Sequence, residues 1–188
     1  MDRKNVAYTL GPVGTDSYNA LVWWMNIREY DATVEVVDEF EMAFQLAMKN
    51  DIILMPAGYQ NRRKGSEYIS WVDFHFRYYE RLSVEDYFLR KTMKMILVEN
   101  VNYKINSIIL HSSTYQLYRM NEKRLKSKEL FWASSKINAL DAFLKNEYRY
   151  AIVSYDELLK RIGNYDISIK ILKMFDPEML WIIYKIKE

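Results

Sequence analysis

The sequence predicts an α/β protein in which helices cover both faces of parallel β-sheets. Short apolar segments typical of strands alternate with segments whose apolar residues recur at helical spacing, from Val6 almost to the end of the chain. Half of the 188 residues are apolar and 28% are charged, as in folded globular proteins. Strands that alternate with helices are joined by crossover connections, and these favour parallel pairing.

The first half of the chain contains three expected strands and two expected helices. The first strand stops at a turn that begins with Gly11, and Asp16 or Ser17 can cap the helix that follows. Pro56 ends the third strand, because proline has no N–H group for strand pairing. The expected strands span residues 6–10, 33–37 and 52–55, and the expected helices span residues 16–28 and 39–49.

The second half continues this alternation after a stretch without a clear pattern. Residues 58–86 are aromatic and charged and follow neither a helical nor a strand period, so we predict no element there. Serines that follow two of the later strands can cap helices. The expected strands span residues 93–98, 107–110, 130–132, 150–153, 167–172 and 179–186, and the expected helices span residues 115–124, 136–144 and 155–162.

Composition excludes several classes of function. The absence of cysteine rules out disulfides, zinc–thiolate sites and thiol nucleophiles. Two histidines, His75 and His111, are too few for a histidine-rich metal cage, and we expect neither a metal nor another cofactor. A net charge of +2 gives no reason to expect a nucleic-acid partner. No stretch approaches the roughly 20 apolar residues that span a bilayer, so we expect a cytoplasmic protein without a membrane partner.

Three junctions between a strand and a helix carry small hydroxyl side chains. Helix N-termini have unpaired N–H groups and a dipole that favour an anion, and ligands of α/β sheets bind outside the carboxyl ends of strands. Each hydroxyl can also be an ordinary helix cap. The three junctions together favour a site for a small carboxylate. The candidate substrate-binding residues from these junctions are Thr15, Ser17, Ser112, Ser113, Ser134 and Ser135.

Other candidate residues have two interpretations each. His111, at the end of a strand, is either a general base or a structural histidine. Arg90 is either a two-pronged clamp for a carboxylate or part of a surface turn. Arg62 and Arg63 are either residues of a ligand site or solvated loop charges. The chain lacks the glycine patterns of nucleotide-binding loops, and no pair of carboxylates at helical spacing forms an acid–base dyad.

The segment from Tyr8 to Ser17 resembles the opening motif of prephenate dehydratases, in which a strand runs into Leu-Gly-Pro-x-Gly-Thr-x-Ser. The resemblance continues in order over essentially the whole chain. It is carried by residues 39–56, 110–113, 133–142 and 150–153.

This resemblance implies a two-lobed, periplasmic-binding-protein-like (type 2) fold with a central ligand cleft. Lobe 1 would hold residues 1–82 plus 175–188, and lobe 2 would hold residues 83–174. We expect no regulatory ACT domain. The expected partner is a small anionic carboxylate substrate, and whether the chain forms a homodimer is left open.

The chain departs from the dehydratase pattern at two places. Ala57 and the two residues after it replace Glu-Asn-Ser, and residues 177–181 lack the Thr-Arg-Phe sequence whose threonine expels the ring hydroxyl. Residues 90–93 and the Met-x-Trp sequence of Met179 and Trp181 are more similar to the non-aromatising prephenate decarboxylases of bacilysin-type pathways.

The resemblance therefore implies a lyase of specialised-metabolite biosynthesis that decarboxylates prephenate, or a similar small cyclic carboxylate, without aromatisation. The candidate catalytic residues are Arg90, Thr92, Met179 and Trp181, and Ala57 and His111 join the substrate-binding set. Met179 and Trp181 either form an apolar wall around the departing carboxylate or belong to the core. The alternatives are a non-catalytic protein that binds or senses a small anion on the same scaffold, and a relative that acts on another metabolite.

Overall fold

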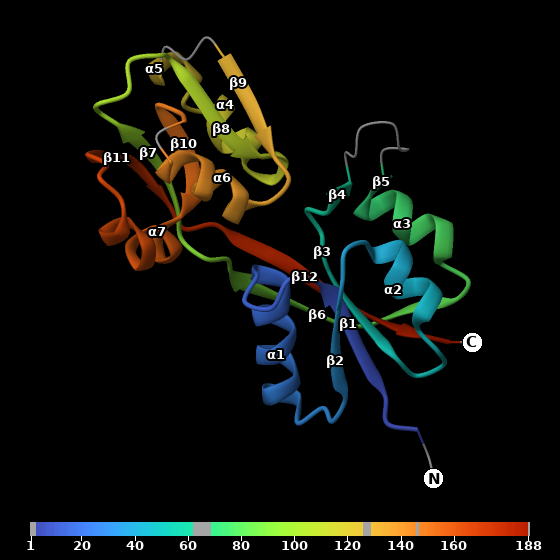
Figure 1. Ribbon diagram of the computed structural model, residues 1–188. Coiled ribbons are helices and arrows are strands. Elements are labelled where there is room, and N and C mark those ends of the chain that lie inside the picture. The colour runs from blue at the N-terminus through green and yellow to red at the C-terminus, as the bar shows by residue number, and fades with distance from the viewer. Residues whose placement is uncertain (1–2, 62–68, 126–128, 146, 188) are drawn as a thin grey trace. The chain divides into compact units, whose positions relative to one another are not determined.

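The computed structural model describes residues 3–61, 69–125, 129–145 and 147–187. The chain divides into two compact units (Figure 1): unit 1 is Met1–Thr92 with Glu178–Glu188, and unit 2 is Met93–Pro177. Each unit is built on one five-stranded sheet with helices on both faces. The predicted α/β class is confirmed. Among the described residues, no helix combines the length and the apolar character needed to cross a membrane.

The sheet of unit 1 has the strand order β2-β1-β3-β12-β6. β2, β1 and β3 are parallel, whereas β12 runs antiparallel to both β3 and β6. The prediction of parallel sheets is therefore wrong for this side of the sheet. Its cause is the topology: the chain leaves unit 1 along β6 and returns along β12, so the two strands run in opposite directions. The strands are β1 (Val6–Leu10), β2 (Thr33–Val37), β3 (Ile52–Pro56), β6 (Leu82–Lys91) and β12 (Glu178–Ile186), beside a small sheet of β4 (Gln60–Asn61) and β5 (Ile69–Ser70).

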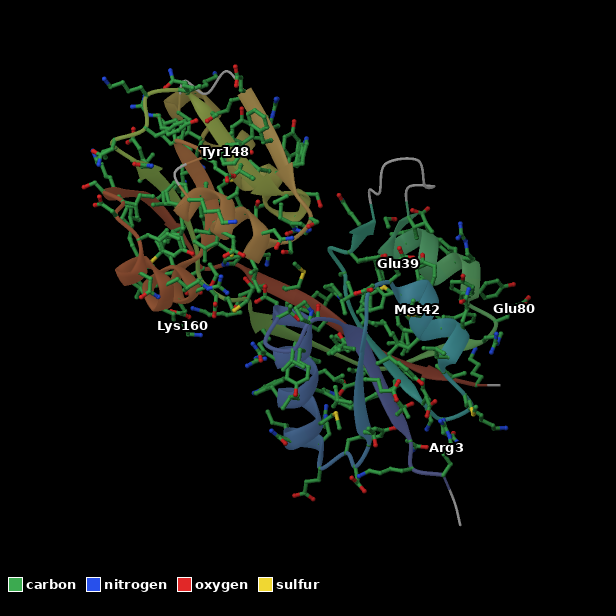
Figure 2. The ribbon with its side chains drawn as sticks, in the orientation of Figure 1. Arg3, Glu39, Met42, Glu80, Tyr148 and Lys160 are labelled. Carbon is green, nitrogen blue, oxygen red and sulfur yellow. The ribbon has the colours of Figure 1, made fainter. Side chains whose placement is uncertain are left out.

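The helices of unit 1 cover the two faces of this sheet separately. α1 packs Ala20, Leu21 and Trp24 on one face, and α2 and α3 form an aromatic-rich cluster on the other. Buried Asp51 joins three segments, because its carboxylate accepts bonds from the backbone N–H groups of Val6 and Met48 and pairs with Arg3. Figure 2 labels Arg3 on the segment that leads into β1. The helices are α1 (Asp16–Arg28), α2 (Phe40–Leu46) and α3 (Trp71–Tyr78).

α3 lies in the stretch for which the sequence predicted no element. A capping box starts it: the Ser70 hydroxyl accepts from the N–H of Asp73, and the Asp73 carboxylate accepts from the N–H of Ser70. The Ser70 hydroxyl also donates to the Asp73 carboxylate at 2.6 Å, and this bond, followed by the one from the N–H of Ser70, lowers the pKa of Asp73. Trp71 Nε1 donates to the Tyr184 hydroxyl at 2.9 Å, and that hydroxyl lies 2.9 Å from His75 Nδ1. His75 therefore serves to dock α3 on β12.

The boundaries between the units differ from the expected ones. The sequence placed them at residues 82/83 and 174/175, whereas the chain divides after Thr92 and before Glu178. The reason is β6, which pairs with β12 from Leu82 to Lys91 and so belongs to unit 1 along its full length.

The sheet of unit 2 has the order β11-β7-β10-β8-β9. β10, β8 and β9 are parallel, and β7 runs antiparallel to its neighbours β10 and β11. The parallel prediction again holds for only part of the sheet. The strands are β7 (Met95–Asn100), β8 (Ser107–His111), β9 (Glu129–Ala133), β10 (Tyr150–Ser154) and β11 (Ile169–Phe175), and the helices are η1 (Ser112–Thr114), α4 (Tyr115–Arg119), α5 (Glu122–Leu125), α6 (Lys136–Leu144), α7 (Tyr155–Arg161) and η2 (Ile162–Asn164).

One helix predicted in unit 2 is broken. The expected helix over residues 115–124 consists of α4 and α5, separated by a turn. Asn121 explains the break, because its side-chain amide donates to the carbonyl of Leu117 at 2.7 Å and thus competes with the helical backbone.

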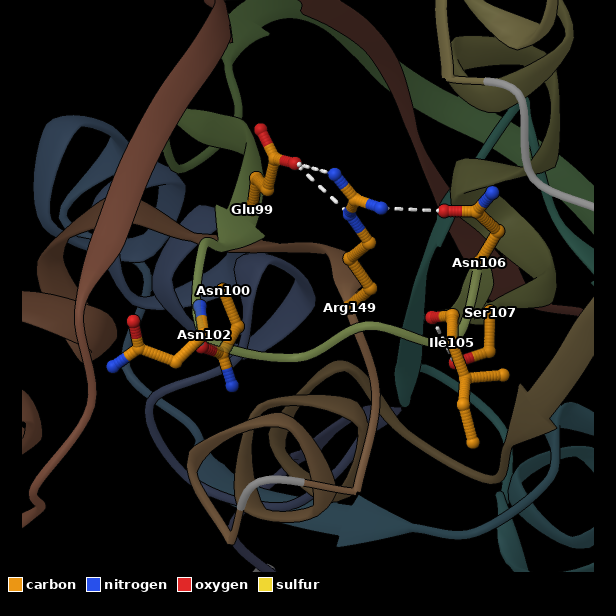
Figure 3. A network of polar contacts seen from close by, with 7 residues as sticks. All are labelled: Glu99, Asn100, Asn102, Ile105, Asn106, Ser107 and Arg149. Carbon is orange, nitrogen blue, oxygen red and sulfur yellow. Dashed lines mark hydrogen bonds and ion pairs between the residues drawn. The ribbon is translucent and has the colours of Figure 1, made fainter.

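A charged network closes the amino-terminal edge of β10 and β8 (Figure 3). Arg149 donates two bonds to Glu99 Oε1, from Nε at 2.9 Å and from Nη2 at 2.8 Å. Its Nη1 donates to Asn106 Oδ1 at 2.6 Å. The network ties β7 to the segments that precede β10 and β8. It therefore stabilises the edge of the sheet opposite the serine junctions.

Candidate functional site

The first group of candidate residues lies at the carboxyl ends of β1 and β3. These strands are parallel neighbours, so their ends meet at one edge of the unit 1 sheet. Thr15 is the N-cap of α1: its hydroxyl accepts from the N–H of Tyr18 at 3.4 Å and donates to the carbonyl of Leu10 at 3.2 Å. Ser17 lies in the first turn of α1 and is buried. Thr15 thus serves as a cap, and it positions the N-terminus of α1 at this edge.

Ala57 and Met179 meet at the same edge although they are far apart in the sequence. The N–H of Ala57 donates to the carbonyl of Leu180 at 2.9 Å. The side chain of Met179 covers Gly58 so closely that a Cβ atom there would lie 3.1 Å from the Met179 methyl carbon. A larger residue at position 58 would therefore require the end of the Met179 side chain to shift by a few tenths of an ångström. Met179 also pairs with Arg90 on β6, whereas Ala57 lies opposite Leu180, the next residue of β12.

Arg90 joins β6 to α1. Its Nη1 donates to the carbonyl of Asn19 at 2.6 Å, and its guanidinium lies 5.3 Å from the ring centre of Trp23. Arg90 belongs to a strand, so the alternative of a surface turn is wrong. The bond to Asn19 uses one of five guanidinium donors. Arg90 as a carboxylate clamp stays a prediction.

The remaining two candidates of unit 1 occupy different surroundings. Thr92, which follows β6 directly, is partly buried. Trp181 is 2% exposed and packs beneath α1 with Trp24 and Ile183, so its ring belongs to the core. Its indole N–H is buried and has no hydrogen-bond partner among the described residues.

The second group lies at the carboxyl ends of β8 and β9 in unit 2. These strands are parallel and pair as far as His111 and Ala133, so the serines that follow each strand are neighbours. Ser135 is the N-cap of α6 and accepts from the N–H of Asn138 at 3.0 Å. The Ser134 hydroxyl accepts from the side-chain amide of Asn138 at 2.7 Å. Asn138 is thus a member of this group that the sequence analysis missed.

His111 is neutral at this edge. Burial first, and then the charge of Lys136, lower its pKa from 6.5 to about 4. The N–H of Ser113 donates to Nδ1 at 3.3 Å, and the Ser113 hydroxyl lies 2.8 Å from the same atom. Because a backbone N–H can only donate, Nδ1 is unprotonated and the ring proton is on Nε2. His111 therefore offers an N–H donor at Nε2. It also caps η1, which begins at Ser112.

The structure thus brings the predicted residues together as one group within each unit. Thr15, Ser17, Ala57, Arg90 and Met179 gather in unit 1, and His111, Ser112, Ser113, Ser134 and Ser135 gather in unit 2. Arg62 and Arg63 lie outside the described residues. In the described part of the chain, no cluster of His, Asp and Glu side chains fits a metal ion.

Comparisons with known proteins support the fold. No protein-family model matches the sequence, and no curated protein sequence matches it significantly. Solved structures do match. The prephenate dehydratase from Arthrobacter aurescens, in complex with L-Phe, has a TM-score of 0.60 at 17% identity over 97% of this chain. The prephenate dehydratase from Staphylococcus aureus has a TM-score of 0.55 at 14% identity over 96% of this chain.

An ABC transporter protein from Parabacteroides distasonis matches with a TM-score of 0.58 at 13% identity, over 97% of this chain and 65% of its own. The fold is the two-lobed type 2 fold. Identities this low establish the fold alone. The chain spans 61% and 66% of the two dehydratases it matches. The expected resemblance to prephenate dehydratases is therefore supported at the level of structure, and activity is a separate matter.

Proposed function

We propose that this chain decarboxylates prephenate, or a similar small cyclic carboxylate, without aromatising the ring, as part of specialised-metabolite biosynthesis. One observation carries the proposal. The two places at which the sequence departs from the dehydratase pattern are in direct contact, since the N–H of Ala57 bonds to the carbonyl of Leu180 at 2.9 Å. The polar residues expected of a dehydratase are replaced there by Ala57 and Met179. An edge without those groups is suited to a reaction in which the ring hydroxyl stays.

The chemistry assigns two tasks to the candidate residues, which are to hold carboxylate oxygens and to keep water from the departing carboxylate. The bond between the ring and its carboxylate breaks, carbon dioxide leaves, the electron pair enters the double bonds of the ring, and a ring carbon takes up a proton. Arg90 and the hydroxyl-lined junctions hold carboxylate oxygens, since charge-assisted bonds from arginine and helix N-termini both favour anions. Met179 supplies an apolar contact that excludes water from the departing carboxylate, which favours its loss. Trp181 supports this contact from the core.

No redox partner or transferred group is needed for this reaction, and so the proposal involves no metal or cofactor. We place the protein in the cytoplasm. The neutral His111 contributes a hydrogen bond from Nε2 rather than a positive charge. Thr92, the last residue of the first segment of unit 1, is proposed to contact the substrate beside Arg90.

A turnover assay tests the proposal. The wild-type protein is incubated with prephenate, and carbon dioxide and phenylpyruvate are both followed, with heat-inactivated protein as the control for the acid-catalysed background. The proposal expects protein-dependent carbon dioxide release without phenylpyruvate. Protein-dependent formation of phenylpyruvate would show that the hydroxyl leaves, and the decarboxylase assignment would fall.

A second candidate function is non-catalytic binding or sensing of a small anion. Its support is the fold, which this chain shares with an arginine transport system periplasmic binding protein from Legionella pneumophila at a TM-score of 0.53 and 10% identity. The hydroxyl residues at the helix N-termini could bind an anion without any catalytic group beside them. This alternative expects prephenate to raise the unfolding temperature without being consumed.

A further inference from the structure

Three neighbouring strands of unit 2 end in serines at one level of the sheet. β10, β8 and β9 are adjacent and parallel, and Ser112 and Ser134 follow β8 and β9 at the same height. On β10, Ala151 pairs with Ile109 of β8. Ser154 lies three residues beyond Ala151, and Ser112 lies three residues beyond Ile109. Ser154 therefore continues the row, with neighbouring strands about 4.8 Å apart.

The hydroxyl of Ser154 is unlike those of the other junctions. The residue is 4% exposed, and its Oγ has no hydrogen-bond partner among the described residues. Ser154 occupies the N-cap position of α7, yet its side chain does not cap the helix, and the N–H of Tyr155 donates instead to the carbonyl of Lys94 at 2.9 Å. Buried polar groups are nearly always paired, so an unpaired one requires an explanation.

We infer that Ser154 is a further ligand-binding residue, whose hydroxyl donates to a carboxylate or another oxyanion held at the carboxyl edge of β10, β8 and β9. The inference rests on the proposed function, because it requires an anion at this edge. A serine hydroxyl can turn between three staggered positions about the Cα–Cβ bond. At the end of a strand, this rotation directs Oγ toward a ligand without movement of the backbone. The ligand then supplies the acceptor that the described residues do not provide for this hydroxyl.

Comparison of Ser154→Ala with wild type tests this inference. Ser168→Ala is the matched control, since Ser168 is an exposed serine of unit 2 just before β11, at the opposite edge of the sheet. Thermal unfolding is measured without ligand, with prephenate and with inorganic phosphate, and prephenate affinity is measured by calorimetry. We expect Ser154→Ala to unfold at the wild-type temperature or about 2–4 °C above it, because alanine removes an unpaired hydroxyl. Its affinity for prephenate should fall roughly tenfold, and that of Ser168→Ala should stay unchanged.

The outcomes distinguish a failure of this inference from a failure of the proposed function. If Ser154→Ala unfolds below wild type, the hydroxyl is paired in the folded protein and the inference is overturned. Wild-type affinity for prephenate in Ser154→Ala also overturns it. If phosphate but not prephenate stabilises wild type, and Ser154→Ala loses that stabilisation, the prephenate assignment falls while Ser154 stands as an anion ligand. A wild type that neither ligand stabilises contradicts both.

Discussion

Substitution of Arg90 by alanine removes one cation from the candidate site and two contacts between β6 and α1. The Nη1 bond to the Asn19 carbonyl measures 2.6 Å, and the guanidinium lies 5.3 Å from the ring centre of Trp23. A cation–π contact that is not fully desolvated contributes about 0.5–1 kcal/mol, and a charge-assisted bond to a ligand about 1.5–3 kcal/mol. We expect Arg90→Ala to lower the unfolding temperature by about 2–4 °C and to weaken prephenate binding roughly tenfold or more.

Arg28 provides the matched control. It joins the last turn of α1 to β6 through Asp86, at 2.8 Å between Nη2 and Oδ2. Burial of Asp86 raises its pKa, but bonds from Trp24, from the N–H of Tyr87 and from Arg28 outweigh this, so the net pKa is lowered. Arg28→Ala therefore removes an arginine between the same two elements at the other end of α1. Calorimetry should find its prephenate affinity unchanged. If Arg90→Ala also binds like wild type, Arg90 only braces α1 and the carboxylate is held elsewhere.

Two further predictions concern unit 2. The pKa of His111, about 4 in the folded protein, lies below the unfolded value near 6.5, so its contribution to stability is complete above pH 6.5 and is lost as the pH falls from there through 4. In denaturant unfolding, His111→Asn should reduce the loss in the free energy of unfolding between pH 6.5 and 4 by at most about 3 kcal/mol. A variant that loses as much stability as wild type over this range would contradict the lowered pKa of His111. Arg149→Met leaves Glu99 largely buried without its partner and should cost about 1–3 kcal/mol. Denaturant unfolding followed by circular dichroism measures this cost, and an unchanged midpoint would show that the network is dispensable.

The elements that the sequence predicted well are those whose surroundings are uniform. Strands covered on both faces read as apolar runs, and so β3 and β10 were found almost to the residue. β6 was missed because it is an edge strand with half of its side chains exposed, including Glu85 and Tyr87. α3 was missed although its signal is local: Ser70 and Asp73 have the spacing of a capping box.

The features of the candidate site also divide into those that the local sequence predicts and those that it does not. Hydroxyl junctions are local features, and the structure bears out Ser135 as a helix cap, whereas α1 is capped by Thr15 rather than by Asp16 or Ser17. Contacts between distant segments, such as Met179 on Gly58 and Arg90 on α1, depend on strand pairing that one sequence does not reveal. Ser154 carried the same signal as the other serines, since it directly follows the apolar run 150–153. Its significance became visible only with the register of β10 and β8.

The mass of the product formed from prephenate tests the central claim most directly. Wild-type protein is incubated with prephenate, and the new species is identified by mass spectrometry against a heat-inactivated control. Our account predicts a product lighter than prephenate by carbon dioxide alone, with the ring hydroxyl kept, because Ala57 and residues 177–181 lack the polar motifs of the dehydratase pattern. A product that has lost both carbon dioxide and water would contradict it.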